Sequence, residues 1–315
     1  MAQAVIERTT SALTVDDLRG DRSRARTERV ARALLFAAAA FSVLVSVLIV
    51  YSLLSETWTF VTQVDWGLLW SDGWFPRRAL YDIKTLVVGS LIVTVVGMAV
   101  AGPIGLGAAV YLSEYASPRV RRVLKPVIEI LAGVPSVVIG FFVLTFISPE
   151  IIQRVSEATP QQTMFAAGIG VGVLIIPLMA SISEDAMRAV PQSLREASYG
   201  MGARKVTTVT KVVLPAAVSG LVAAFIVAVS RAIGETMVVF IAAGKSGGSL
   251  FELNPFEPGL TMTAAMASIA SGTDNVVGEA LTFQSLFFVG MLLFVVTLVL
   301  NVFADRFVRR VRERY

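Results

Sequence analysis

Two oppositely charged residues, Arg231 and Glu235, lie inside a long apolar stretch and are the residues most suited to chemistry on an ion. Their spacing of four places them on one face of a helix. A charge near the middle of a bilayer costs at least about 2.5–3.5 kcal/mol on insertion scales, so such residues usually mark a function. The planar donor fork of arginine suits a tetrahedral oxyanion, and a carboxylate can accept a hydrogen bond from a protonated phosphate oxygen. We therefore expect a substrate pathway here; a mutual ion pair that only holds helices together is the alternative.

The elements that must position this pair are membrane helices. The chain has 315 residues, of which 55% are hydrophobic and 16% are charged, and its mean hydropathy is +0.74. A membrane span needs about 20 apolar residues. Six such runs lie near 33–54, 86–112, 127–147, 164–182, 216–243 and 283–303. The sequence therefore predicts an all-α membrane protein with six transmembrane helices, and the composition excludes a soluble domain.

The distribution of basic residues predicts the orientation of the helices. With the N- and C-termini in the cytoplasm, the segments 1–32, 113–126, 183–213 and 304–315 are inside and hold 21 Lys and Arg residues. The outside segments 55–85, 148–163 and 244–282 hold 5. Cytoplasmic loops carry an excess of basic residues, so this difference favours the orientation with both termini inside. The net charge of +4 then reflects membrane topology and requires no nucleic-acid partner.

These patterns divide the chain into four parts. They are a cytoplasmic tail at 1–32, a first transmembrane helix with a periplasmic segment at 33–85, a transmembrane domain at 86–303, and a basic cytoplasmic tail at 304–315. The first apolar run begins too deep in the chain and is too long for a cleaved signal peptide, so we interpret it as a retained anchor. The chain contains no cysteine and no histidine, which excludes disulfides and the commonest metal ligand.

The third predicted span contains a helix-breaking sequence, Ala-Gly-Val-Pro-Ser at 132–136. Pro135 removes a backbone donor and disfavours a helical conformation in the residue before it. Broken helices in a bilayer are tolerated where they are buried or line a cavity. We expect Gly133, Pro135 and Ser136 to form a helix break that lines the pathway. For Gly168 and Gly172 in the fourth span, close helix packing is the simpler interpretation.

The polar segment 183–215 has more structure than a connection requires. Ser193 and Glu196 fit a capping box that would start a short helix. Gly200 and Gly202 would end it, and a second helix can form before Pro215. Helix connections usually run two to eight residues, so about 30 patterned residues indicate a docking surface for a soluble partner. A simple connecting loop is the alternative.

One apparent nucleotide motif is misleading. The Gly-Lys-Ser sequence at 244–246 resembles the end of a phosphate-binding P-loop, but Val239 stands where the first glycine of that motif would lie. The sequence therefore predicts no catalytic residue, no metal site and no cofactor bound by this chain. Energy for transport must come from an ion gradient or from a partner.

The loop sequence resembles the EAA loop of bacterial ABC importer permeases. The residues that carry the resemblance are Glu196, Ala197, Ser198, Gly202, Leu214 and Pro215, with Ser198 in place of a second alanine and Val212 in place of the usual isoleucine. The resemblance implies a type I ABC importer permease fold in the bacterial plasma (inner) membrane. It also implies that these residues form a coupling helix, which sits in a groove of a cytoplasmic ATPase subunit that binds ATP and Mg²⁺.

Three further stretches, 131–138, 231–237 and 261–264, resemble phosphate-specific importer permeases, and Thr236-Met237 favours the PstC-like over the PstA-like subunit. This resemblance implies a PstA-like sister permease, two PstB-like ATP-binding subunits and a periplasmic or lipid-anchored PstS-like phosphate-binding protein. It assigns Arg231 and Glu235 to phosphate movement by alternating access. Two alternatives stay open: a permease for another oxyanion, molybdate or sulfate, and an ion-driven secondary transporter that works alone.

Overall fold

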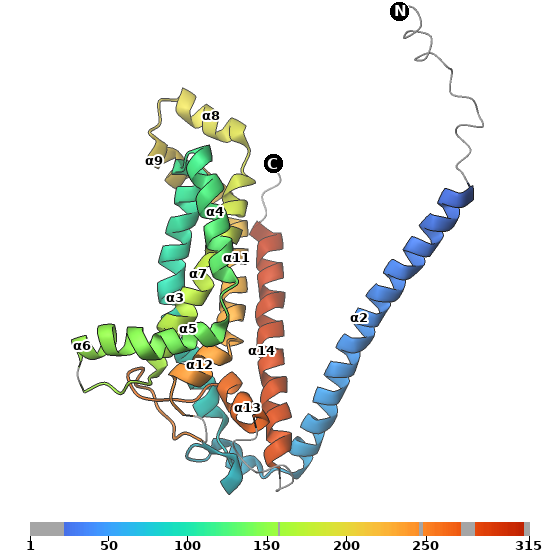
Figure 1. Cartoon of the computed structure of the whole chain (residues 1–315), viewed down its shortest axis with the longest axis vertical. Helices are drawn as coiled ribbons and strands as arrows, with labels where there is room; N and C mark the ends of the chain where they lie inside the picture. The colour runs from blue at the N-terminus through green and yellow to red at the C-terminus, as the bar shows by residue number, and fades with distance from the viewer. Residues whose placement is uncertain (1–21, 157, 246–247, 272–280, 312–315) are drawn as a thin grey trace, which may run out of the picture. The chain divides into compact units, whose positions relative to one another are not determined.

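The protein is described here from a computed structural model, which describes residues 22–156, 158–245, 248–271 and 281–311 (Figure 1). The longer α-helices are α2 (Arg22–Gln63), α3 (Ile83–Val110), α4 (Pro118–Ala132), α7 (Met164–Arg188), α11 (Val218–Ile233) and α14 (Thr282–Val311). The shorter ones are α5 (Ser136–Phe142), α6 (Gln153–Val155), α8 (Gln192–Gly200), α9 (Lys205–Thr208), α10 (Leu214–Ala216), α12 (Met237–Ala242) and α13 (Met262–Ala270). The 3₁₀-helices are η1 (Trp66–Trp70) and η2 (Pro76–Arg78), and the π-helical turns are η3 (Tyr111–Tyr115), η4 (Val143–Ile152) and η5 (Val209–Val213). A two-stranded antiparallel hairpin pairs β1 (Trp74–Phe75) with β2 (Leu80–Tyr81).

The predicted all-α membrane architecture is confirmed. Five helical segments of the described chain are long and apolar enough to cross a membrane: 27–63, 83–115, 136–155, 164–188 and 282–308. A sixth is formed if the bent pair 205–216 and 218–233 is counted as one span. The last 4 of the 12 residues predicted as the basic C-terminal tail are among those outside the description, as are most of the N-terminal tail and Ser246 of the misleading motif.

The chain divides into two compact units, residues 1–54 and 55–315. In its described part the first unit is the beginning of α2, whose side chains from residue 27 are almost all exposed. An exposed helix of this hydropathy is stable only in lipid or against another membrane subunit. The second unit contains the core and every candidate site.

The centre of the second unit is the packing of α3 on α7 (Figure 1). Small residues let the two backbones approach closely. A methyl group added at Gly168 would lie 2.6 Å from Val96 Cβ, and one added at Gly172 would lie 2.8 Å from the carbonyl oxygen of Gly97. The interpretation of Gly168 and Gly172 as packing residues is therefore confirmed. Helix α11 packs on both α7 and α14, which places the end of α11 within this core.

The predicted third span, 127–147, is wrong in its boundaries. Helix α4 ends at Ala132 with Gly133 as its C-cap, and α5 begins only after Pro135. The apolar segment long enough to span is 136–155, and Figure 1 shows α5 running across the direction of α4 and α7. Pro135 has no N–H and keeps Val134 out of the helical region, so the apolar run cannot continue as one helix.

The predicted fifth span, 216–243, is also interrupted. The helical segment 205–216 meets 218–233 at an angle of 71°, α11 ends at Ile233, and α12 starts at Met237. The prediction that Pro215 stops the preceding helix is wrong, because the bend comes at Ala217. The π-helical turn η5 just before Pro215 widens the helix where proline lacks its N–H, so the chain passes through the proline without a break.

Candidate functional site

Arg231 and Glu235 face each other at the end of α11. Arg231 lies in the last turn of the helix, and Glu235 follows the C-cap Gly234. Arg231 Nη1 lies 3.2 Å from Glu235 Oε2. The two side chains lie together, but not on one helix face as predicted, because Glu235 lies past the end of α11. Their role in the substrate pathway stays a prediction.

The two partners differ in exposure. The Arg231 side chain is 51% exposed and the Glu235 side chain is 3% exposed. Within the described residues, Glu235 Oε2 accepts no well-aligned hydrogen bond, so the contact is an ion pair without hydrogen-bond geometry. An arginine with one poorly aligned partner keeps most of its five N–H donors available for an anion.

The backbone around Glu235 is fixed by α13. Thr263 donates a hydrogen bond to the carbonyl oxygen of Glu235 at 2.7 Å, and Thr261 caps the N-terminus of the same helix. Thr261 and Thr263 are also within hydrogen-bond distance of each other at 3.2 Å. These buried contacts hold the carboxylate-bearing turn, whereas the arginine remains half-exposed. The result is a buried carboxylate on a backbone turn held by α13, beside a half-exposed guanidinium.

The break at Gly133, Pro135 and Ser136 exists as predicted. Pro135 adopts an extended conformation as the N-cap of α5, and both Gly133 and Pro135 are exposed on this chain. Helix α5 packs against α12, the short helix that follows the Arg231–Glu235 turn. The helix after the Pro135 break therefore packs against the helix after the Arg231–Glu235 turn. The pathway-lining role of Gly133, Pro135 and Ser136 stays a prediction.

The segment predicted as a coupling loop forms two short helices, α8 and α9. Helix α8 ends at Gly200, and Gly202 has a positive φ of 78°, which confirms the predicted glycine turn. The Ser198 hydroxyl lies 2.9 Å from that of Thr208, which ties α8 to α9. Glu196 and Ala197 are exposed, and Met201 is 88% exposed. Leu214 and Pro215 belong to α10.

The predicted capping box at Ser193 and Glu196 is wrong. Helix α8 begins at Gln192, and its N-cap is Pro191, which makes no side-chain cap hydrogen bond. Pro191 is itself extended, with φ −56° and ψ 138°, so the helix begins at the next residue, Gln192. Glu196 is therefore not needed to start the helix, and its exposed carboxylate is available to a partner.

Sequence reasoning missed a buried ion pair that attaches α8 to the end of α3. Arg195 donates to both oxygens of Glu114, at 2.9 Å and 3.4 Å. Its remaining donors bind the carbonyl oxygens of Val190 at 2.6 Å and Met187 at 2.9 Å. Ser113 donates to the same carboxylate at 2.8 Å. These residues are far apart in sequence, so no periodicity could have paired them.

A second acidic residue, Glu184 in α7, is fully buried beside the basic helix α4. Arg121 Nε donates to Glu184 Oε1 at 2.7 Å, and Lys125 Nζ lies 3.0 Å from Oε2. Lys125 also binds Asp185 at 2.9 Å. The pKa of Lys125 is raised above its ordinary value, first by the hydrogen bond to Asp185 and then by Glu184, while partial burial opposes the shift.

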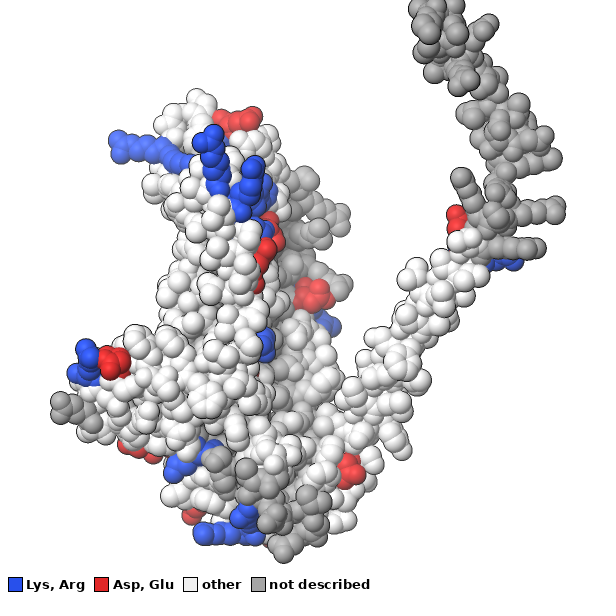
Figure 2. All heavy atoms as spheres, viewed as in Figure 1, with Lys and Arg blue, Asp and Glu red and all other residues white. Residues whose placement is uncertain are grey.

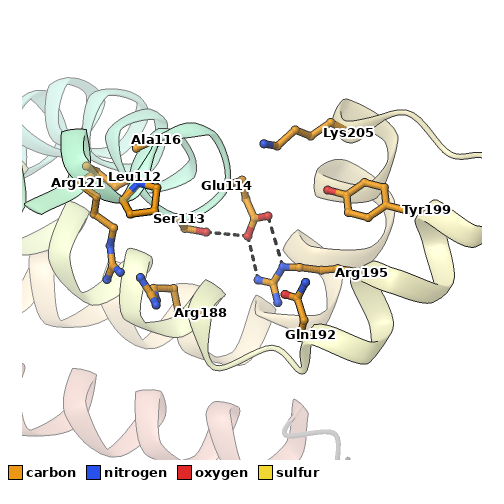
Figure 3. A pocket seen from close by; sticks show the side chains of 11 residues that line it. Leu112, Ser113, Glu114, Ala116, Arg121, Arg188, Gln192, Arg195, Tyr199 and Lys205 are labelled. Atoms are coloured by element: carbon orange, nitrogen blue, oxygen red, sulfur yellow. Dashed lines mark hydrogen bonds and ion pairs between the residues drawn. The ribbon is translucent and has the colours of Figure 1, made fainter.

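Basic side chains gather over α4, α8 and α9 at one end of the second unit (Figure 2). A pocket of about 460 Å³ lies between these helices and the ends of α3 and α7 (Figure 3). Its lining residues are Leu112, Ser113, Glu114, Ala116, Pro118, Arg121, Arg188, Gln192, Arg195, Tyr199 and Lys205. Among the described residues, basic side chains thus gather beneath α8, apart from the Arg231–Glu235 pair at the end of α11.

Comparison with known proteins agrees with this architecture. Residues 101–313 match the model of the family described as "Binding-protein-dependent transport system inner membrane component". The chain is 37% identical over 204 residues to the probable ABC transporter permease protein YqgH of Bacillus subtilis, covering 65% of this chain and 63% of that one. It is 29% identical over 296 residues to the phosphate transport system permease protein PstC of Pasteurella multocida, covering 88% and 90%.

Solved structures agree with the fold. A bacterial alginate ABC transporter, in complex with a periplasmic protein bound to an alginate pentasaccharide, matches 91% of this chain and 98% of its own with a TM-score of 0.63 at 14% identity. That likeness concerns the fold alone. The family match covers most of the chain and includes both the α8–α9 segment and the Arg231–Glu235 turn. This chain belongs to the family of binding-protein-dependent transport system inner membrane components, as a multi-pass permease subunit of an ABC importer.

Proposed function

We propose that this chain is the PstC-like permease subunit of an ATP-driven importer of inorganic phosphate. The observation that carries the proposal is the pair at the end of α11, where a half-exposed Arg231 stands beside a buried Glu235. Inorganic phosphate near neutral pH carries both negative charge and a proton. An arginine donor and a carboxylate acceptor fit those two features at one site.

The name of the PstC relative supports phosphate as the cargo, since the chain aligns with it over 88% of its own length. The same phosphate chemistry follows independently from the residues. Glu235 can accept a hydrogen bond from a protonated phosphate oxygen, whereas sulfate is fully ionised and has no proton to offer. The buried carboxylate would therefore repel sulfate while it tolerates phosphate.

Transport would proceed by alternating access. A periplasmic or lipid-anchored PstS-like protein delivers phosphate to the outer side, and Arg231 holds the ion only transiently, because a tight site would not release it. ATP with Mg²⁺, bound by two PstB-like subunits and not by this chain, drives the movement. The exposed face of α8, with Glu196 and Ala197, supports docking of an ATPase subunit there.

The partner set follows from this scheme. A PstA-like sister permease would complete the translocation pathway, and its contacts would cover apolar surface that is exposed on this chain, such as Ile130 in α4 and Phe141 in α5. Membrane lipid surrounds the remainder, and no nucleic acid is involved. The predicted orientation, with both termini and α8 in the cytoplasm, places the basic end of the second unit inside.

Uptake by proteoliposomes that contain the full assembly tests the proposal. We expect ATP-dependent phosphate uptake that excess sulfate or molybdate does not inhibit. Glu235→Gln should allow sulfate to compete, because the substituted amide has no charge to repel it, and should reduce phosphate uptake. Unchanged phosphate uptake and sulfate rejection in Glu235→Gln would overturn the role of the carboxylate.

The two alternatives separate in the same preparation. Family membership disfavours a secondary transporter that works alone. Such a transporter would take up phosphate without ATP, and vanadate would not inhibit it. A molybdate or sulfate permease predicts that the favoured oxyanion competes with phosphate in the unmodified protein. Copurification of an ATPase, together with vanadate-sensitive phosphate uptake, supports the proposed function.

A further inference from the structure

The pocket beneath α8 carries more positive than negative charge. Four cationic side chains line it, Arg121, Arg188, Arg195 and Lys205, against a single lining carboxylate, Glu114 (Figure 3). Glu184, which lies behind Arg121, supplies a second negative charge. The local charge therefore exceeds neutrality by two positive charges.

Two of the four cations are already satisfied. Arg195 donates hydrogen bonds to Glu114 and to the carbonyl oxygens of Met187 and Val190. Arg121 is bound to Glu184, and its Nε–Oε1 distance is 2.7 Å. These side chains form the fixed wall of the pocket, and the donors of Arg195 in particular are used within the protein.

The other two cations are weakly engaged. Arg188 lies 3.9 Å from Glu184, which exceeds hydrogen-bond distance, and its side chain is 47% exposed. The ammonium of Lys205 lies 4.9 Å from the centre of the Tyr115 ring. Arg188 ends α7 and Lys205 begins α9, and Figure 3 shows them on either side of the Glu114 carboxylate. Tyr199 and Gln192 add a hydroxyl and an amide to the same lining.

We propose that this pocket binds the phosphate group of a ligand, with Arg188 and Lys205 as its main contacts. A guanidinium fork and an ammonium that face one cavity suit a doubly charged tetrahedral oxyanion. A volume of about 460 Å³ admits a phosphate group with its water. Two sources share this chemistry: free inorganic phosphate, and the headgroup of an anionic lipid, since the pocket lies at the end of membrane helices.

Occupancy has a mechanical consequence. If one anion contacts both Arg188 and Lys205, it joins the end of α7 to the α8–α9 segment, in addition to the Arg195–Glu114 pair. It would therefore hold α8 in place against the bundle. This consequence rests on the proposed function: if α8 couples to an ATPase, phosphate on that side of the membrane slows transport. The binding itself does not depend on transport.

Equilibrium binding of radiolabelled inorganic phosphate to the assembly of permease and ATPase subunits, purified without the PstS-like phosphate-binding protein, tests the site. All samples carry Arg231→Ala, so that the proposed translocation site does not contribute. In nanodiscs of neutral lipid, the added pair Arg188→Gln and Lys205→Gln should weaken phosphate binding at least about tenfold, because charge-assisted contacts are lost. The matched pair Arg204→Gln and Lys211→Gln removes the same charge from exposed residues outside the pocket and should leave binding unchanged.

Nanodiscs that contain anionic lipid distinguish the two sources. If a lipid headgroup occupies the pocket, anionic lipid suppresses phosphate binding, and the pocket pair reduces the anionic lipid that copurifies with the assembly. If free phosphate is the ligand, anionic lipid has no effect on binding. Lys205→Arg keeps the charge and should retain binding in the otherwise unmodified pocket, which separates a lost ligand from a lost fold.

Three results would overturn the proposal. They are equal binding in the pocket pair and the matched pair, absence of both phosphate and retained anionic lipid, and loss of ATPase copurification without any change in binding. The last result would assign the pocket to an acidic partner surface. Failure of the proposed function would give a different result, because uptake would be absent while phosphate binding to the pocket remained.

Discussion

Two arginine–carboxylate pairs at different levels of this protein use the same chemistry in opposite ways. At the end of α3, Glu114 and Arg195 are both buried, and every contact of the arginine is a hydrogen bond to Glu114 or to a backbone carbonyl. At the end of α11, Glu235 is buried but Arg231 is 51% exposed and makes a single ion-pair contact. The first pair is closed to ligands, and the second is open to one.

The difference shows that residue type alone does not distinguish a structural ion pair from a substrate site. A buried pair is stable only when its remaining donors and acceptors are satisfied, as they are around Arg195. An arginine left with unused donors beside a fixed acid has capacity for an anion. Donor satisfaction therefore separates the two pairs where sequence spacing does not.

The largest expected effect comes from removing the open arginine. Arg231→Ala should abolish phosphate uptake, because no other described cation stands at the end of α11, while the assembly remains folded. The measurements are ATP-dependent uptake in proteoliposomes and the thermal midpoint of the assembly. Arg231→Lys is the control, and it should keep partial uptake, since the charge remains but the planar fork is lost. Full uptake by Arg231→Ala would show that the Arg231–Glu235 pair is structural, like the Arg195–Glu114 pair.

A nearly equal loss of phosphate uptake is expected from a change in the glycine turn between α8 and α9. Gly202 has a positive φ of 78°, and a side chain added there meets open space, so only the backbone conformation demands glycine. Gly202→Asp should abolish uptake while the chain still inserts in the membrane, because strain and a new negative charge fall on the docking surface. Gly202→Ala adds the strain without the charge and should keep more uptake. Normal uptake by Gly202→Asp would remove the coupling role of this turn.

Breaking the closed pair should affect stability first. Arg195→Gln leaves Glu114 as an uncompensated buried charge, which costs about 3–5 kcal/mol. We expect a lower thermal midpoint and a lower yield of assembly. Combining Glu114→Gln with Arg195→Gln removes the stranded charge and should restore most of the stability. If the double variant were as unstable as Arg195→Gln, the ion pair would not explain the loss.

The smallest effect concerns the link between α8 and α9. Ser198→Ala removes a hydroxyl pair that joins Ser198 to Thr208 and should cost about 1 kcal/mol. Uptake should persist with a slightly lower thermal midpoint. Thr210→Ala in the neighbouring exposed turn is the matched control and should change the midpoint less. A complete loss of uptake in Ser198→Ala would mean that the hydroxyl contacts a partner.

The sequence predicted the membrane class and the helix break at Pro135, and the structure agrees. It predicted Arg231 and Glu235 on one helix face, whereas the structure pairs them across the end of α11. Hydropathy and a spacing of four residues are local signals, so they indicate membrane helices and neighbouring side chains without knowledge of the packing. The span boundaries at 127–147 and 216–243 were wrong, because an apolar run is continuous in composition even where the backbone turns. The capping box failed for a related reason, since Pro191 starts α8 before Ser193 can cap it.

By itself, the sequence determined that this chain is a polytopic helical permease and which two charges lie within its apolar stretches, because both depend on residue types close in sequence. Only the tertiary structure decided which ion pairs are complete. Glu114 and Arg195 meet across 81 positions, and Glu184 lies among basic residues of another helix. Such contacts depend on how α3, α4, α7 and α8 pack, and long-range packing leaves no periodic trace in the chain.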